Sequence, residues 1–238
     1  MSNSSLKYFI SAPQHTVERE RLLHLTVAQQ LKLYAAKSGV RLMITEPELD
    51  IEGFDFVISS EFESIYIQSK GRLKQGGAKQ WKIRAALLKP SLYNSDLVPE
   101  LDGYKIGGYA TGASGGVLIH EIDEGGADAG EFNVSYYYLD IFWLIGVASG
   151  VAGRPQLQRK RAVELLRKIR AADDVQRVTI HLKDFARLKS IASLAYLRLH
   201  VSGPSNWASS CYARGDLAEL GCAGDFAIFW QGVRDVLE

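Results

Sequence analysis

The spacing of hydrophobic residues predicts a long helix near the start of the chain. Between residues 17 and 38, four apolar side chains recur at helical spacing and form one stripe: Leu23, Val27, Leu31 and Tyr34. Gly39 follows, and glycine is common directly after the last turn of a helix. Residues 40–44 then predict a short strand.

Two apolar segments, 53–59 and 64–70, predict an antiparallel hairpin. With a tight turn centred on Glu61 and Phe62, Val57 lies opposite Tyr66. Because side chains alternate between faces, this register gathers three polar residues on one face: Asp55, Gln68 and Lys70. A slip of one residue would break this cluster. The other face is expected to supply core residues: Phe54, Phe56, Ile58, Ile65 and Ile67.

The rest of the chain alternates between helical and strand patterns. We expect strands at 116–123, 133–145 (the second running into a helix) and 176–182, and helices at 78–89, 153–174 and 184–200. This order predicts an α/β fold with a mixed central sheet flanked by helices and a C-terminal α/β extension. A boundary near residues 150–155 would divide the chain into 1–150 and 151–238, or the whole chain forms one domain.

The composition is that of an ordinary globular protein. The chain has 238 residues, of which 47% are hydrophobic and 23% are charged. Neither a signal peptide nor a membrane span is expected. Cys211 and Cys222 are the only cysteines, which excludes a disulfide framework and favours a reducing, cytoplasmic location.

The net charge of +1 hides a strong segregation of charge along the chain. Residues 68–90 contain no acid, residues 91–140 are acidic, and residues 154–170 are basic again. This pattern predicts that a polyanion, in particular a nucleic acid, binds at one place; the alternative is a solvated helix face. The expected phosphate contacts are Arg72, Lys74, Lys79, Lys82 and Arg84. Residues 91–140 are interpreted as a surface for a protein partner or activator, an autoinhibitory element or solvated loops.

The polar cluster of the hairpin has the chemistry of a phosphodiesterase site. Magnesium prefers oxygen ligands, and Asp55 supplies a carboxylate while Gln68 supplies an amide oxygen. Lys70 is placed to orient the attacking water or to stabilise the charged phosphate. Glu20, on the apolar stripe of the first helix, would bring a second carboxylate. The alternative is that these are solvent-facing residues of an ordinary hairpin.

The helix with an acid, the strand segment GFDF, the segment IYIQSK and the basic segment after it resemble the PD-(D/E)XK nuclease superfamily. Within it, Gln68-Ser69-Lys70 is similar to the Gln-x-Lys motif of the Mrr-like branch. The resemblance covers about residues 17–90. It implies a restriction-endonuclease-like fold, a Mg²⁺ cofactor with Mn²⁺ as a substitute, and DNA cleavage in restriction or anti-phage defence.

By this resemblance Asp55, Gln68 and Glu20 are expected metal ligands, and Lys70 is the expected catalytic lysine. Glu18 is an alternative helical acid and Asp50 an alternative strand acid. The sequence departs from the family pattern before Asp55, where no proline stands.

The sequence thus predicts a magnesium-dependent DNA endonuclease. The alternative is a catalytically silent nuclease-fold protein that binds nucleic acid. A homodimer is expected if both strands of a duplex are cut, because one site serves one strand. A third interpretation, a serine hydrolase with its nucleophile at Ser114 in GASGG, is disfavoured because a strand pattern follows the serine where a helix is required.

Overall fold

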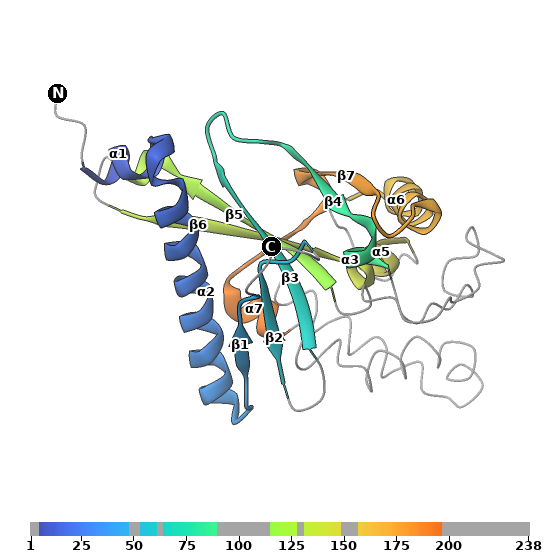
Figure 1. The fold of residues 1–238 in the computed structure, drawn as a ribbon, viewed down its shortest axis with the longest axis horizontal. Helices are drawn as coiled ribbons and strands as arrows, with labels where there is room; N and C mark the ends of the chain where they lie inside the picture. The colour runs from blue at the N-terminus through green and yellow to red at the C-terminus, as the bar shows by residue number, and fades with distance from the viewer. Residues whose placement is uncertain are drawn as a thin grey trace.

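The computed structural model describes residues 5–47, 53–60, 64–89, 115–127, 131–148 and 157–196. It shows a mixed α/β fold built on a six-stranded sheet with helices on both faces (Figure 1). The order of the strands across the sheet is β1-β2-β3-β5-β6-β8, and a separate two-stranded ribbon pairs β4 with β7. The expectation of a mixed sheet flanked by helices is therefore confirmed.

The strands of the described residues are β1 (Met43–Thr45), β2 (Phe56–Ser59), β3 (Ser64–Leu73), β4 (Gln80–Arg84), β5 (Gly115–Asp123), β6 (Asn133–Asp140), β7 (Arg177–His181) and β8 (Ala186–Leu188). The helices are α1 (Ser5–Ser11), α2 (Thr16–Ser38), α3 (Ala85–Leu88), α4 (Glu124–Ala127), α5 (Ile141–Ala148), α6 (Arg159–Ala171) and α7 (Ile191–Tyr196), with short 3-10 turns at Pro13–His15 and Leu182–Asp184.

The first helix and the hairpin follow the sequence prediction closely. Helix α2 ends before Gly39, which adopts the left-handed conformation with φ of 67°. Strands β2 and β3 pair antiparallel with Val57 opposite Tyr66, the predicted register. Strand β5 then runs parallel to β3, while the other neighbours in the sheet pair antiparallel.

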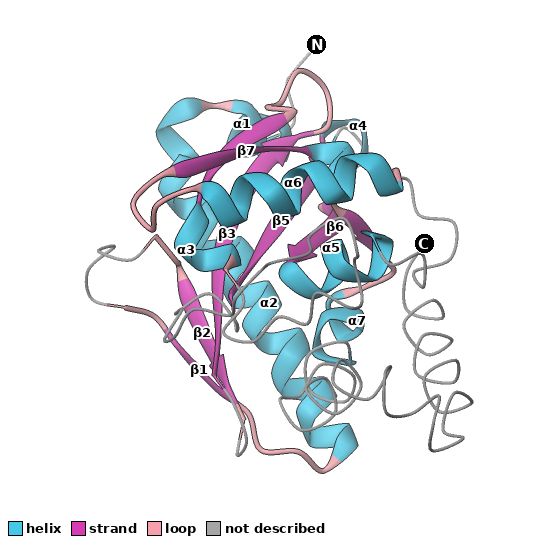
Figure 2. Ribbon diagram, turned by 90° about the vertical axis from the view of Figure 1, so that its right-hand side faces the viewer, coloured by secondary structure: helices cyan, strands magenta, loops and turns pink. Residues whose placement is uncertain are grey.

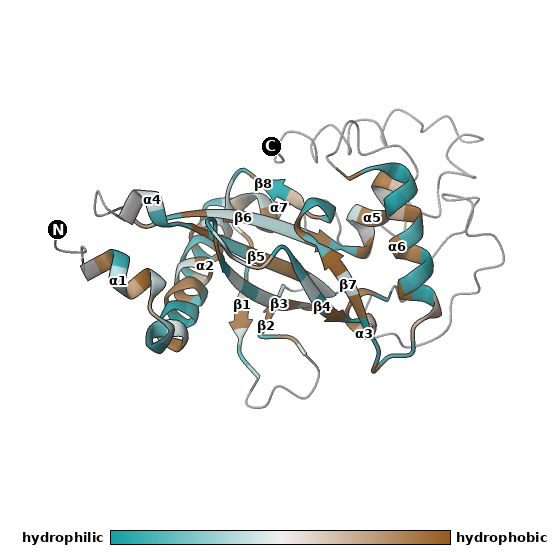
Figure 3. Cartoon of the chain, turned by 90° about the horizontal axis from the view of Figure 1, so that it is seen from above, coloured by the Kyte–Doolittle hydropathy of each residue, from teal (hydrophilic) through white to brown (hydrophobic). Residues whose placement is uncertain are grey.

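Each face of the sheet has its own hydrophobic core. On one face, α2 and α7 cover apolar side chains of the sheet, among them Phe56, Ile67 and Leu118. On the other face, the β4–β7 ribbon and helices α3, α5 and α6 pack around Val117, Ile119 and neighbouring residues. Figure 2 shows α6 lying over the sheet on the side away from α2. In Figure 3, α6 alternates between brown and teal, as expected for a helix with one buried side.

Segments on either side of residues 150–155 pair with one another. Strand β7 pairs with β4, and β8 forms the edge of the main sheet beside β6. One core cluster contains residues from both parts of the chain, for example Ile83 and Leu166. Residues 150–156 themselves lie outside the described residues.

Two predicted helices are wrong. Residues 78–89 contain strand β4 and the four-residue helix α3, because Trp81 and Ile83 point inward while Gln80 and Lys82 are exposed, an alternation of period two. In the segment 184–200, Asp184 ends a 3-10 turn, Ala186–Leu188 form strand β8 with Ala186 and Leu188 buried at the sheet edge, and of the described residues Ile191–Tyr196 form an α-helix. Residues 197–200 lie outside the described part of the chain.

Candidate functional site

The carboxylate of Asp55 lies at the start of the hairpin, next to strand β3. Its Oδ2 accepts a hydrogen bond from the backbone N–H of Ser69 at 2.5 Å. The same Oδ2 lies 3.8 Å from Nζ of Lys70, an ion pair in which both side chains are partly exposed. The structure therefore brings Asp55 and Lys70 together, as the predicted register required.

The pairing of β2 with β3 begins at Phe56, one residue after Asp55, and the backbone bends just before it. The N–H of Asp55 donates to the carbonyl of Ile67, and Gly53 adopts a positive φ of 80°. This bend turns Phe54 to the face of Tyr66, whose ring centroid lies 4.9 Å away. The prediction that Phe54 shares a face with Phe56 is therefore wrong, whereas Phe56, Ile58, Ile65 and Ile67 are buried as expected.

The amide of Gln68 carries an unusual feature for a partly buried side chain. Its Oε1 is shielded from solvent and has no hydrogen-bond partner in the described part of the chain. A buried amide oxygen without a partner loses its hydration and gains nothing in return. This oxygen has the chemistry of a magnesium ligand, so its environment fits the role that the motif implies.

Arg84 joins this group from strand β4. A Cβ placed on Gly53 would lie 3.0 Å from Cδ of Arg84 and 3.9 Å from Nε2 of Gln68. The Arg84 side chain therefore passes directly over Gly53 and beside Gln68. Its guanidinium adds a cation, with a geometry that suits phosphate, to the cluster.

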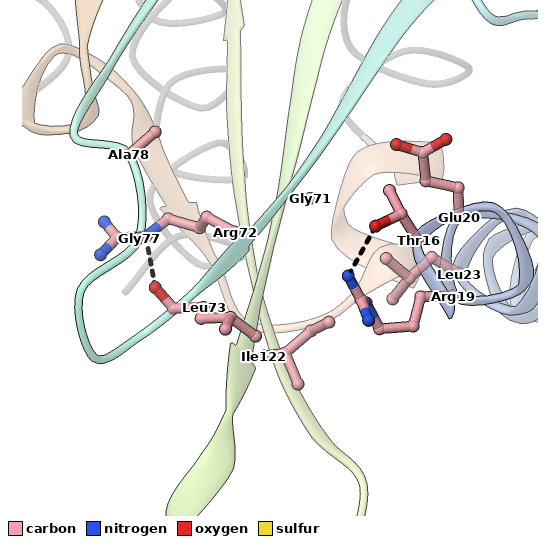
Figure 4. A pocket seen from close by; sticks show the side chains of 10 residues that line it. All are labelled: Thr16, Arg19, Glu20, Leu23, Gly71, Arg72, Leu73, Gly77, Ala78 and Ile122. Carbon is pink, nitrogen blue, oxygen red and sulfur yellow. Dashed lines mark hydrogen bonds between the residues drawn. The ribbon is translucent and has the colours of Figure 1, made fainter. Parts of the chain in front are cut away.

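Glu20 lies elsewhere. Helix α2 covers the face of β3 that carries Ser69 and Gly71, and a Cβ on Gly71 would lie 3.6 Å from Cδ1 of Leu23. Lys70 points to the opposite face because side chains alternate along a strand. Figure 4 shows the Glu20 carboxylate at the rim of a pocket of about 240 Å³, turned away from Leu73 and Ile122.

Among the described residues, Glu20 forms no hydrogen bond or ion pair with the Asp55 cluster. Glu18 is exposed on the same helix, and Asp50 lies outside the described residues. Within the described part of the chain, no group of three His, Cys, Asp or Glu side chains could hold a metal ion. Magnesium often keeps several waters and needs only one or two carboxylates, so one carboxylate from Asp55 and one amide oxygen from Gln68 fit its ligand preference.

The five basic residues expected to contact DNA divide into three kinds. Arg72 is buried and lies 3.3 Å from Glu121 Oε2. Lys74 pairs with Asp123 at 2.7 Å, and this hydrogen bond raises the pKa of Lys74. Lys79 and Lys82 are exposed, and Arg84 is half-buried beside Gly53. Lys79 and Lys82 are therefore accessible to a ligand at the surface, whereas the Arg72 guanidinium is shielded from solvent.

The acidic segment also has structural roles where it is described. Glu121 is buried beside Arg72, and Tyr137 donates to it at 3.1 Å. The buried Asp140 accepts from the Tyr138 hydroxyl and from the Trp143 backbone N–H. Residues 90–114, which include Ser114, lie outside the described residues. Gly115 begins strand β5 directly after that serine, so the helix of a nucleophile elbow does not follow it.

The sequence analysis does not identify two residues of this region, Ser69 and Arg177. Ser69 stands between Gln68 and Lys70, and its hydroxyl lies 2.8 Å from Nε2 of the buried His120. Arg177 on β7 lies directly opposite Arg84. The strand pattern at 176–182 predicts the alternation that exposes Arg177, but only the fold reveals which strand it joins.

In comparisons with known proteins, no family model, curated protein or solved structure matches the chain. None of the helices in the described residues is both long and apolar enough to cross a membrane.

Proposed function

We propose that the chain is a magnesium-dependent nuclease that hydrolyses DNA, with Mn²⁺ as a substitute ion. The observation that carries this proposal is the grouping of Asp55, Lys70 and the partnerless Oε1 of Gln68 at one end of the hairpin. The topology supports it too. Strands β1, β2 and β3 pair antiparallel and β5 pairs parallel with β3, and a mixed sheet of this kind is what the PD-(D/E)XK resemblance implies. A role in restriction or anti-phage defence rests on the resemblance alone.

The residues of the site divide the chemistry among them. A bound Mg²⁺ would polarise the phosphoryl oxygen and supply an activated water. Asp55 and Gln68 would hold the ion through one carboxylate and one amide oxygen. Lys70 donates hydrogen bonds from Nζ and so orients the attacking water or a non-bridging phosphate oxygen. Arg84 offsets the negative charge that develops on the phosphate.

The test is cleavage of plasmid and linear DNA with Mg²⁺, Mn²⁺ or chelator. We compare the wild type with Lys70→Ala and Asp55→Asn, and with Lys37→Ala, an exposed lysine at the end of α2, as the control. Asn keeps a side-chain oxygen that can accept from the Ser69 N–H, so the hairpin is preserved. The proposal requires metal-dependent cutting that both site variants lose and the control keeps.

A second function is favoured by the low negative charge of the site, since Asp55 is the one carboxylate in the group of Asp55, Gln68, Lys70 and Arg84. In that case the chain binds nucleic acid without cutting it. Wild-type protein that binds DNA and leaves it intact with every metal would support this alternative.

A further inference from the structure

The outward face of the β4–β7 ribbon carries an unusual set of side chains. Antiparallel pairing places Arg84 opposite Arg177, Lys82 opposite Thr179 and Gln80 opposite His181. The alternate residues of the ribbon, Trp81, Ile83, Val178 and Ile180, belong to the hydrophobic core or pack against it. The ribbon therefore has one apolar face turned inward and one polar face turned outward.

This outward face is positively charged. Segments 79–84 and 177–183 contain no acidic residue. Lys82 and Arg177 are exposed and form no ion pair within the described part of the chain. Their positive charges lie on one face of a ribbon whose two strands contain no acidic residue, so an anion bound there would gain favourable Coulomb interactions.

Two acidic side chains near the ends of the ribbon, Asp184 and Asp174, already have partners. The buried Asp184 accepts two hydrogen bonds from Arg161, at 3.2 and 3.0 Å. At the other end, Asp174 pairs with Lys89 at 2.7 Å. Neither carboxylate neutralises the outward face of the ribbon.

The ribbon meets the candidate site at Arg84, which passes over Gly53 beside Gln68. Lys82 lies two residues before Arg84 on β4, roughly 7 Å away along the strand. We propose that the outward face of the ribbon binds the phosphate backbone of duplex DNA and leads it to the Asp55 cluster. This inference rests on the proposed function for its second half, the delivery of DNA to a cutting site.

The shape and chemistry of the face favour a nucleic acid over an acidic protein. A two-stranded ribbon fits the major groove of B-DNA, which is about 12 Å wide. Gln80, Thr179 and His181 add hydrogen-bonding groups suited to phosphates or base edges. Protein interfaces are usually anchored by aromatic or apolar residues, and the ribbon turns its only aromatic side chain, Trp81, inward.

The experiment measures binding of a fluorescent DNA duplex to the full chain in chelator across a salt series. The test variant is Lys82→Glu/Arg177→Glu. The control, Lys37→Glu/Arg21→Glu, makes the same change in net charge on helix α2. We expect the test variant to bind about tenfold more weakly at fixed salt. The slope of log K against log salt should fall by about one for each lost contact, and the control should bind as the wild type does.

Equal losses in the test and control variants would overturn the proposal, since they would reveal only a general effect of charge. Displacement of the duplex by poly-glutamate at equal charge concentration would also overturn it, in favour of an acidic protein partner. Cleavage assays run in parallel separate this inference from the proposed function. Binding that depends on the ribbon, without cleavage, would support DNA binding by the ribbon and contradict the proposed nuclease activity. Undiminished cleavage by Lys82→Glu/Arg177→Glu would support the nuclease activity and contradict DNA binding by the ribbon.

Discussion

The hydroxyl oxygen of Ser69 lies 2.8 Å from Nε2 of His120, on the face of β3 opposite to Lys70. The backbone N–H of the same serine donates to the Asp55 carboxylate. Ser69 therefore links the candidate site on one face of the sheet to a buried polar pair on the other. Any shift of β3 would disturb both contacts, so this pair helps to fix the position of Asp55.

The buried His120 predicts how the stability of the protein depends on pH. Burial, with a smaller effect from the nearby His24, lowers the pKa of His120 to about 3. Histidine in an unfolded chain has a pKa of about 6.5. Between pH 6.5 and pH 3, His120 is therefore protonated in the unfolded state and neutral in the folded state. Stability should therefore fall as the pH falls, by up to about 1.4 kcal/mol per pH unit from this group.

The measurement is urea unfolding of the wild type and His120→Gln between pH 7.5 and 4. At pH 7.5 the difference between them reports the packing and hydrogen bonding lost by the substitution. At lower pH the gap should close as the wild type loses stability faster. Parallel pH profiles would show that His120 does not cause the loss.

Gly53 should tolerate no side chain, and the reason is specific to the site. Its φ of 80° disfavours any other residue, and an added Cβ would lie 3.0 Å from Cδ of Arg84. Gly39 has a similar φ of 67° with nothing within 4 Å of its Cβ position. Gly39→Ala should therefore cost roughly 1–2 kcal/mol from the backbone alone. Gly53→Ala should cost at least as much and also displace Arg84, weakening DNA binding. Urea unfolding and duplex binding of both variants would check this, and equal DNA affinities would contradict it.

Replacing Gln68 with an apolar residue should stabilise the metal-free protein and weaken metal binding. Because its buried Oε1 lacks a partner in the described residues, Gln68→Met should raise the free energy of unfolding in chelator by about 1 kcal/mol. The same variant should lose the stabilisation that Mg²⁺ gives the wild type. Thermal unfolding with chelator and with increasing Mg²⁺ measures both effects, with Gln29→Met on the exposed side of α2 as control. A variant that is less stable in chelator and still responds to Mg²⁺ would contradict the role of Gln68.

The hairpin could be predicted because its pattern is local, whereas the ribbon could not. Val57 and Tyr66 are separated by a short turn, so alternation and turn position fix the register. The hydrophobic pattern of residues 78–89 matches both a helix and a strand: Ile83 and Leu87 have the i, i+4 spacing of a helix, while Trp81 and Ile83 have the i, i+2 spacing of a strand. Strand β7, nearly one hundred residues further along the chain, decides between them by pairing with β4.

Glu20 illustrates a second limit of sequence reasoning. The helical period correctly predicts the stripe of α2 that is buried, including Leu23, Val27 and Leu31. It does not say which face of the sheet that stripe covers. The helix packs against the face opposite to Lys70, which separates Glu20 from the other predicted ligands.

Arg72 and Lys74 allow the structural and the DNA-binding roles of basic residues to be separated. The Arg72 side chain is only 4% exposed and pairs with Glu121, which also accepts from Tyr137. Arg72→Met would leave the Glu121 carboxylate buried without its cation and should cost about 3–5 kcal/mol of stability. Adding Glu121→Gln should restore much of that loss, because the uncompensated charge is then gone.

Lys74 is the matched control, since it directly follows the same strand and its pair with Asp123 is exposed to solvent. Lys74→Met should change the free energy of unfolding by less than about 1 kcal/mol. Urea unfolding of the three variants, with duplex binding measured on those that fold, distinguishes the two roles. If Arg72→Met were as stable as the wild type yet bound DNA as weakly as Lys82→Glu/Arg177→Glu, Arg72 would be a DNA contact after all. The burial of its guanidinium leads us to expect the reverse, a loss of stability that Glu121→Gln repairs.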